Sequence, residues 1–321
     1  MDIFTVITML GGLAMFLYGM EIMGDGLKSS SSKALKSMLE KVTQSVVLGV
    51  LTGTLVTAVI QSSTATIVLT VGLLGAGILN LRQAVSIVMG ANIGTTVTAQ
   101  LIRLMDIDAG GNIILDFFNP DTLAPIAMIA GIILLMFIKK KKTTGVGTML
   151  MGFGLLFTGL MLMSDSVAPL AESPAFAGAV QKFSNNPFLG ILTGLVTTFI
   201  IQSSSAMTGI LQALSSTGVL TFNMVYPVIM GINLGTCVTT AIVCSIGTNK
   251  DSKRTGFAHI AFNTIGTVLF MIAMTLLHRF GVLDGTWNRV VDSGDIANFT
   301  TIFNLATAIV LIPFANQLVK L

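Results

Sequence analysis

Two segments of this chain are copies of one another, and this duplication limits the folds open to the chain more than any other feature. Residues 48–98 align with residues 189–239 at a constant offset of 141, without a gap, and 21 of the 51 aligned positions are identical. Both copies contain Gln-Ser-Ser-(Thr or Ser)-Ala and, further on, Asn-x-Gly-Thr. The segment before each copy also repeats, at an offset of 140. Self-similarity of this kind predicts two copies of one structural unit.

Composition places these copies in a membrane. Of the residues, 53% are apolar and only 10% are charged, whereas a soluble globular chain carries roughly a quarter of its residues as charges. The net charge of +3 is small, so the lipid bilayer is an expected partner and nucleic acid is not. A membrane-spanning helix needs about 20 apolar residues, and apolar stretches of sufficient length recur along the whole chain. They cover 3–27, 46–79, 82–102, 122–138, 144–163, 187–220, 223–246, 256–280 and 297–319.

Two of these stretches, 46–79 and 187–220, are too long for one crossing and carry Gly, Gln and Ser at their centres. At 1.5 Å per residue, each divides into two helices of about 15 residues that reach only mid-membrane, which predicts a re-entrant hairpin. Polar, non-helical backbone survives at that depth only where protein or a water-filled cavity surrounds it. The Asn-x-Gly-Thr segments at 92–95 and 233–236 predict a broken span after each hairpin.

The charges of the loops predict that the two halves are inverted. Lys and Arg prefer the cytoplasmic side. Segment 28–41 has net charge +3 and its counterpart 164–186 has −1, whereas segment 103–122 has −3 and its counterpart 247–256 has +2. The linker 139–142 consists of four lysines and is expected in the cytoplasm. The N-terminus is therefore predicted outside and the C-terminus inside.

The predicted fold is an all-α polytopic membrane protein with two inverted-topology repeats. Each repeat contains a re-entrant helical hairpin and a broken transmembrane helix, and an extra C-terminal span follows. The expected boundaries are 1–138 for the first repeat, 139–143 for the cytoplasmic basic linker, 144–280 for the second repeat, and 281–321 for an extracellular loop and the extra span.

The repeated core is polar but almost uncharged. No charged residue occurs in the 67 positions between Lys182 and Lys250, and Arg82 is the single charge between Lys41 and Arg103. Gln, Ser, Thr and Asn offer both donors and oxygen acceptors. A helix that starts at a hairpin tip also presents free N–H groups and a positive dipole end, which suit an anion. Oxygens beside these tips are ligands for a hard cation such as Na⁺, as in inverted-repeat transporters.

A packing interpretation accompanies each of these motifs. Ser-Ser in a membrane helix often joins helices, although its occurrence at corresponding places in both halves favours a site. The Asn-Thr pairs could simply satisfy the backbone of a broken helix. His259 is expected to be structural rather than a proton carrier. Neither His-Glu-x-x-His nor Gly-x-Ser-x-Gly occurs, and no carboxylates cluster, so the sequence does not predict an enzyme.

With these motifs in place, the chain resembles the type II sodium–phosphate cotransporter family, and in particular its bacterial members. The resemblance rests on Gln-Ser-Ser-(Thr or Ser)-Ala at 61–65 and 202–206, on Gly-x-Asn-x-Gly-Thr at 90–95 and 231–236, and on His-x-x-Phe-Asn at 259–263. It implies that the Gln-Ser-Ser tips bind phosphate and Na⁺, with no organic cofactor. The implied phosphate ligands are Gln61, Ser62, Ser63, Thr64, Gln202, Ser203, Ser204 and Ser205. The implied Na⁺ ligands are Gln61, Ser63, Asn92, Thr95, Gln202, Ser204, Asn233 and Thr236.

The sequence departs from the family pattern in three respects. Thr64 replaces a serine but keeps the hydroxyl. Residues 300–304 read Thr-Thr-Ile-Phe-Asn where relatives often have a histidine. Many bacterial members continue into a cytosolic regulatory domain, whereas this sequence ends just after its last apolar stretch.

The predicted function is Na⁺-driven import of inorganic phosphate by alternating access, with phosphate and Na⁺ as partners. The expected location is the bacterial inner membrane, and a homodimer is left open. One alternative is Na⁺-coupled transport of another oxyanion, such as sulfate, arsenate or a dicarboxylate, because uncharged donors do not specify their ligand. A second alternative is a passive anion channel, which would need no Na⁺ gradient.

Overall fold

The computed structural model describes residues 3–40, 45–106, 120–138, 141–169, 186–245 and 250–320. Within these residues the secondary structure is helical, apart from one isolated β-bridge between Thr221 and Val290. The first half contains α1 (Ile3–Glu40), α2 (Val46–Ile60), α3 (Ser63–Gly75), α4 (Leu81–Ile102), the short η1 (Arg103–Asp106) and α6 (Pro120–Phe137). The second half contains α7 (Lys141–Val167), α9 (Pro187–Ile201), α10 (Ser204–Ser215), α11 (Phe222–Ser245) and α12 (Lys250–Arg279). The chain continues through α13 (Asp284–Trp287), α14 (Ser293–Leu311), η3 (Ile312–Phe314) and α15 (Ala315–Lys320).

The prediction of a helical, multi-pass membrane protein is confirmed. Among the described residues, seven helices are long and apolar enough to cross a membrane: α1, α4, α6, α7, α11, α12 and α14 with its C-terminal extension. Large apolar side chains such as Phe137 and Phe188 are each 76% exposed. Exposed apolar surface of this extent is unfavourable in water but normal where a helix faces lipid.

The two long apolar stretches are each divided into two short helices. The first division lies between α2 and α3, and the second lies between α9 and α10. In both, the dividing residue is a glutamine in the left-handed backbone conformation: Gln61 has φ 59° and Gln202 has φ 58°. A residue other than glycine rarely adopts this conformation. Because the same conformation occurs at the same position of both copies, the turn is a defined feature of the repeated unit.

The prediction of a span broken at Asn-x-Gly-Thr is wrong. Both α4 and α11 run through the motif as continuous helices. Asn92 and Asn233 each donate a side-chain hydrogen bond to the carbonyl one turn earlier, at 3.0 and 2.8 Å. The motif glycine Gly94 serves helix contact instead, because a methyl group there would overlap the carbonyl oxygen of Thr54 in α2. Glycine and other small residues in the contact between membrane helices let the helices approach closely.

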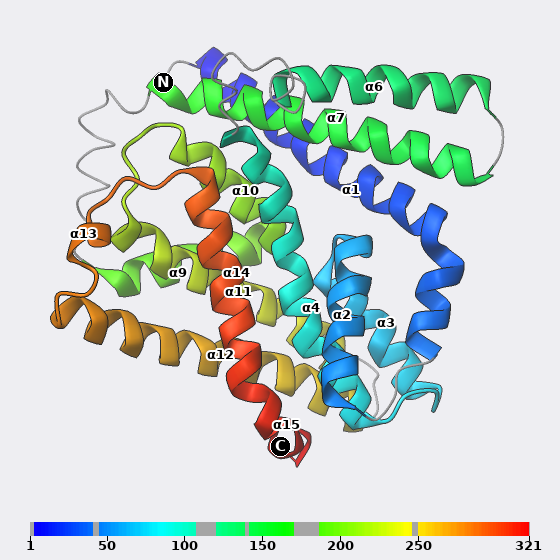
Figure 1. Ribbon diagram of the computed structural model, residues 1–321, viewed down its shortest axis with the longest axis vertical. Helices are drawn as coiled ribbons and strands as arrows, with labels where there is room; N and C mark the ends of the chain where they lie inside the picture. Colours follow the sequence, from blue (N-terminus) through cyan, green and yellow to red (C-terminus); the bar gives the residue numbers. More distant parts are fainter. Residues whose placement is uncertain are drawn as a thin grey trace.

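The same kind of contact joins α1 to α7. A Cβ atom added at Gly12 would lie 2.8 Å from the carbonyl oxygen of Gly159, and one added at Gly19 would lie 2.8 Å from that of Gly152. As the residue number rises in α1 it falls in α7, so the two helices are antiparallel. Figure 1 shows α1, α7 and α6 along one side of the molecule, with α4 and α14 crossing its middle.

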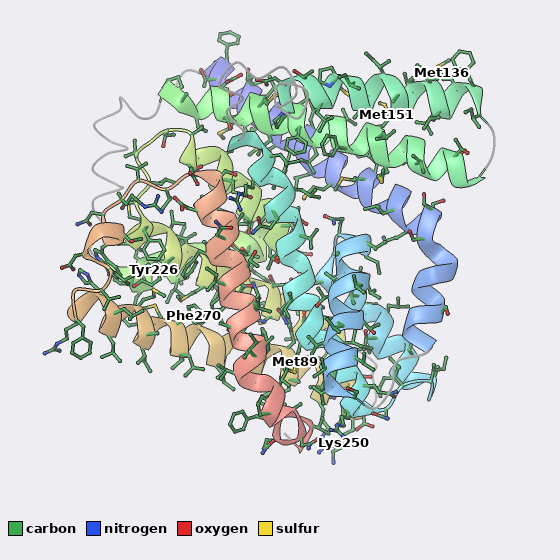
Figure 2. All side chains as sticks on the ribbon, viewed as in Figure 1. Met89, Met136, Met151, Tyr226, Lys250 and Phe270 are labelled. Carbon is green, nitrogen blue, oxygen red and sulfur yellow. The ribbon has the colours of Figure 1, made fainter. Side chains whose placement is uncertain are left out.

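One cluster of the apolar core joins α11, α12 and α14. Tyr226 and Phe299 are buried, and Phe222, Phe270 and Trp287 pack around them. Figure 2 shows Tyr226 and Phe270 in the same region, beside α11 and α12. Rings in tilted and edge contacts of this kind stabilise a core by their buried area and geometry. This cluster fixes α11, α12 and α14 to one another.

Several loops that carried the inversion argument are outside the described residues. This applies to 107–119, to 170–185, to 246–249 and to residues 139–140 of the basic linker. The boundaries of the predicted domains therefore stay predictions.

Candidate functional site

Both Gln-Ser-Ser turns line one cavity of about 340 Å³. The turns come from segments 141 residues apart in the sequence, yet the two glutamines and all six hydroxyl residues that follow them border the same space. Among the described residues, the lining consists of Leu17, Met20, Glu21, Asp25, Lys28, Ile60, Gln61, Ser62, Ser63, Thr64, Ala65, Gln202, Ser203, Ser204, Ser205 and Thr236.

Each turn ends one helix and begins the next. The backbone N–H of Gln61 donates to the carbonyl of Thr57 at 2.7 Å, and that of Gln202 donates to Thr198 at 2.7 Å, which caps α2 and α9. The following serine is the N-cap of the next helix. The hydroxyl of Ser62 accepts the N–H of Ala65 at 3.2 Å, and Ser203 does the same for Ala206 at 3.1 Å. Serine is among the preferred residues at this position.

The N-termini of two helices, α3 and α10, therefore border the cavity. The first backbone N–H groups of α3 and α10 have no partner within their helices, and the residues that carry them line the cavity. The dipole of each helix adds partial positive charge at the same end. Two N-termini that border one space form a site suited to an anion with several oxygens, such as phosphate.

The Gln61 side chain is fixed by its surroundings. Its Oε1 accepts from the hydroxyl of Thr98 in α4 at 2.7 Å, and its Nε2 donates to the carbonyl of Ala58. Between the two helices that this turn joins, the buried hydroxyl of Thr57 in α2 donates to that of Thr66 in α3 at 3.0 Å. The first turn is thus tied to both α3 and α4.

Charged residues from α1 also line the cavity, and the sequence analysis did not include them. Glu21, Asp25 and Lys28 are spaced by four and three residues, so they share one face of α1. Lys28 Nζ lies 3.3 Å from Asp25 Oδ1, and the two side chains are 43% and 62% exposed. The expectation of an uncharged site holds for the hairpin turns but not for this face. The i, i+4, i+7 spacing of these residues indicates a charged face on α1. The sequence does not predict that this face packs beside the Gln-Ser-Ser turns.

Of the residues implied for Na⁺ outside the turns, only Thr236 lines the cavity. Asn92 is buried in a network between helices, where its Oδ1 lies 3.1 Å from both His259 Nε2 and Asn263 Nδ2. The hydroxyl of Thr95 donates to the carbonyl of Ala91, 3.1 Å away. Asn233 bonds within α11, as described above.

Comparison with known proteins gives this geometry a context. A family model described as Na⁺/Pi-cotransporter matches the chain twice, over residues 15–165 and 162–293. The uncharacterized protein YqeW of Bacillus subtilis strain 168 is 27% identical over 308 residues, which cover 95% of this chain and 93% of that protein. The putative inorganic phosphate export protein YjbB of Escherichia coli strain K12 is 23% identical over 317 residues, which cover 98% of this chain and 55% of that protein.

A mammalian protein is similar over a shorter length. The sodium-dependent phosphate transport protein 2B of Pongo abelii is 28% identical over 188 residues, which cover 55% of this chain and 26% of that protein. No solved structure matches the chain significantly. The chain spans nearly all of the Bacillus relative but only about half of the Escherichia relative. Because the two family matches together extend over most of its length, the chain belongs to the Na⁺/Pi-cotransporter family of membrane transport proteins.

Proposed function

We propose that this protein is a sodium-coupled symporter that imports inorganic phosphate by alternating access. The observation that carries the proposal is the single cavity bordered by both Gln-Ser-Ser turns. Family membership supports phosphate as the cargo. The phosphate oxygens would accept hydrogen bonds from the amides and hydroxyls at the starts of α3 and α10. The proposed ligands are Gln61, Ser62, Ser63, Thr64, Gln202, Ser203, Ser204 and Ser205.

The proposal couples phosphate to Na⁺ through charge balance. Phosphate at neutral pH carries between one and two negative charges, and Lys28 is the single cationic side chain among the described residues of the cavity lining. Glu21 and Asp25 add negative charge on the same lining, so co-bound cations would lower the electrostatic cost of the anion. The side-chain oxygens of Gln61, Ser63, Gln202, Ser204 and Thr236 are within the lining and are our proposed Na⁺ ligands there. Transporters with inverted repeats commonly bind substrate and Na⁺ together at such turns.

We further propose that the two halves are inverted repeats and that both helix pairs are re-entrant hairpins. The contact between α1 and α7 supports inversion. An offset of 140 maps Gly12 onto Gly152 and Gly19 onto Gly159, so the two glycine contacts are exchanged with each other, as in a two-fold interface. A two-fold axis that relates antiparallel helices is perpendicular to both. If both helices span the membrane, that axis lies in its plane.

Alternating access is supported by a difference between the halves. Gly24 of α1 lies against the carbonyl of Ile60 in α2. The equivalent helix α7 instead makes its main contact with the second hairpin through α10 rather than α9. Two copies of one unit in different arrangements can exchange their arrangements, which would open the cavity to the other side. We place the protein in the bacterial inner membrane, with the N-terminus outside and the C-terminus in the cytoplasm.

Uptake of labelled phosphate into proteoliposomes tests the function. An inward Na⁺ gradient should drive accumulation, whereas equal gradients of K⁺ or H⁺ should not, and an excess of phosphate should compete better than sulfate, arsenate or a dicarboxylate. Equal uptake with and without a Na⁺ gradient would remove the symport claim. Stronger competition by sulfate would remove the substrate claim.

The name of the Escherichia relative favours a second candidate, phosphate export. The same vesicles, loaded with labelled phosphate, discriminate between the two. Efflux that is independent of external and internal Na⁺ would favour an exporter or a passive channel. Efflux that accelerates when Na⁺ is placed inside would favour the symporter working in reverse.

A further inference from the structure

A second cavity, of about 260 Å³, lies at the opposite end of α10 from the phosphate site. The helix begins at Ser204 on the first cavity and ends at Ser215 on the second. Its 12 residues span roughly 18 Å. The lining of the second cavity is Ser164, Gln212, Ser215, Ser216, Val290, Val291, Asp292 and Ser293.

The donors on this lining are largely committed to other partners. The hydroxyl of Ser215 donates to the carbonyl of Gln212 at 2.6 Å, and that of Ser216 donates to Ala213 at 2.7 Å. The Gln212 amide nitrogen lies 3.0 Å from the carbonyl of Ala99 and 3.1 and 2.9 Å from the carbonyl and hydroxyl of Ser293. Because carbonyls only accept, these contacts fix the orientation of the amide and leave its Oε1 as an acceptor.

Two of the lining residues each have a buried side-chain oxygen without a hydrogen-bond partner. These oxygens are Oε1 of Gln212, a residue 2% exposed, and Oγ of Ser164, a residue 8% exposed. A buried polar atom that makes no hydrogen bond is costly. The hydroxyl oxygens of Ser215 and Ser216 also keep free lone pairs, since each has donated its proton to the helix. The lining residues therefore offer several acceptor oxygens, and the hydroxyl of Ser164 is in addition a donor without a partner.

The charge at the second cavity comes from one carboxylate and from two helix ends. Within the part of the chain that the structure describes, Asp292 is the single charged residue on its lining. The nearby guanidinium of Arg289 is held by Asp295 at 2.7 Å, and this pairing raises the pKa of Arg289. One oxygen of Asp292 accepts the N–H of Asp295 at 2.7 Å as an N-cap. The C-terminus of α10 adds partial negative charge here, and the N-terminus of α14, which Asp292 caps, adds partial positive charge.

We infer that this cavity is a Na⁺ site separate from the Gln-Ser-Ser turns, with Asp292, Gln212 and Ser164 as its main ligands. One carboxylate among neutral oxygens balances a monovalent ion, whereas calcium sites in proteins usually collect several carboxylates. Half-helix C-termini are known positions for coupling ions in transporters. The inference rests on the proposed symport. It gives α10 an anion site at one end and a cation site at the other, so that both ions act on one rigid element.

Binding of ²²Na⁺ to the purified full chain in detergent, without phosphate, tests the inference. The variant Asp292→Asn keeps a capable N-cap but removes the charge, and Ser164→Ala removes an unpartnered hydroxyl. We expect Asp292→Asn to weaken Na⁺ binding at this site about tenfold, since it removes the negative charge, and Ser164→Ala to weaken it severalfold, since it removes one ion–oxygen contact. The control is Asp284→Asn, which removes an exposed carboxylate outside the lining and should bind Na⁺ like the wild type.

The Na⁺ dependence of phosphate uptake separates this inference from the proposed function. Na⁺-driven uptake with the same Na⁺ dependence in the wild type and in both variants overturns the cation site and leaves symport intact. Na⁺ binding that is lost in Asp292→Asn, together with uptake that ignores Na⁺, supports the cation site and overturns symport. Unchanged ²²Na⁺ binding in both variants also overturns the site. If Asp292→Asn fails to fold, Ser164→Ala decides the question alone.

Discussion

At the scale of single residues, Gln61 and Gln202 combine two properties that rarely occur together. Each takes the left-handed backbone conformation usually left to glycine, and each places an amide side chain on the cavity. Strained conformations of this kind persist where the surroundings hold them and are frequent at functional sites. Glycine would adopt this backbone conformation with less steric strain. We therefore attribute the presence of glutamine at this position to its amide side chain.

This view gives a prediction for Gln202. Both Gln202→Ala and Gln202→Gly should abolish phosphate uptake, because both remove the amide. The Gly variant should melt at a higher temperature than the Ala variant, because only glycine takes φ 58° freely, a difference worth about 1 kcal/mol. Uptake in proteoliposomes and thermal melting in detergent are the two measurements. Retained uptake in either variant, or unfolding of both, would assign Gln202 to packing.

Lys28 is the residue that sequence patterns alone did not connect to the site. It borders the cavity beside Asp25 and is partly exposed, so under the proposed function its positive charge would attract phosphate to the cavity. We predict that Lys28→Ala raises the phosphate concentration for half-maximal uptake severalfold, and that added salt reduces the difference, because salt screens exposed charges. Lys28→Arg should behave like the wild type. An unchanged half-maximal concentration in Lys28→Ala would restrict this residue to its ion pair with Asp25.

At the scale of elements, the N-termini of α3 and α10 both border the candidate site. The start of α10 can be tested at its cap, Ser203. Asp and Asn cap helices about as well as Ser, so Ser203→Asp and Ser203→Asn should both fold. The Asp variant should lose phosphate binding, since it places a negative charge where the anion would bind, while the Asn variant should retain a measurable part. Equal phosphate binding by both variants, measured by equilibrium dialysis, would contradict an anion site at this helix start.

The contact between α2 and α4 depends on glycine. Gly90→Ala should destabilise the protein by about 1–3 kcal/mol, since the added methyl group overlaps the carbonyl of Val50 and forces the helices apart. Gly72 provides the matched control. It lies inside α3 with nothing within 4 Å of an added Cβ atom, so Gly72→Ala should stabilise by roughly 0.5–1 kcal/mol. Melting temperatures in detergent compare the two, and equal shifts would rule out the close contact as the cause.

At the scale of the whole molecule, the proposed inversion makes equivalent positions of the two halves face opposite sides. Asp121 and Lys250 begin equivalent spans, α6 and α12, and both are exposed. We predict that a membrane-impermeant maleimide labels Asp121→Cys in intact cells, whereas it labels Lys250→Cys only after permeabilisation. The native cysteines, Cys237 and Cys244, are buried and should contribute little background. Labelling of both variants from the same side would indicate parallel repeats.

The sequence by itself determined the helical membrane fold, the duplication and the two turns. These features depend on local chemistry: apolar length defines a span, and a serine after Gln61 or Gln202 caps the helix that follows. The mistaken break at Asn-x-Gly-Thr shows the limit of the same reasoning. Asn and Gly are expected to interrupt an isolated helix, but Gly94 is needed for contact with α2, and Asn92 bonds to its own helix and to His259.

The tertiary structure alone decided which distant segments meet. It placed both Gln-Ser-Ser turns on one cavity, added Asp25 and Lys28 from α1, and set a second cavity against the end of α10. These neighbours depend on the register and crossing of helices far apart in the chain. That register is fixed by many small packing contacts acting together, and no single residue type or spacing records it.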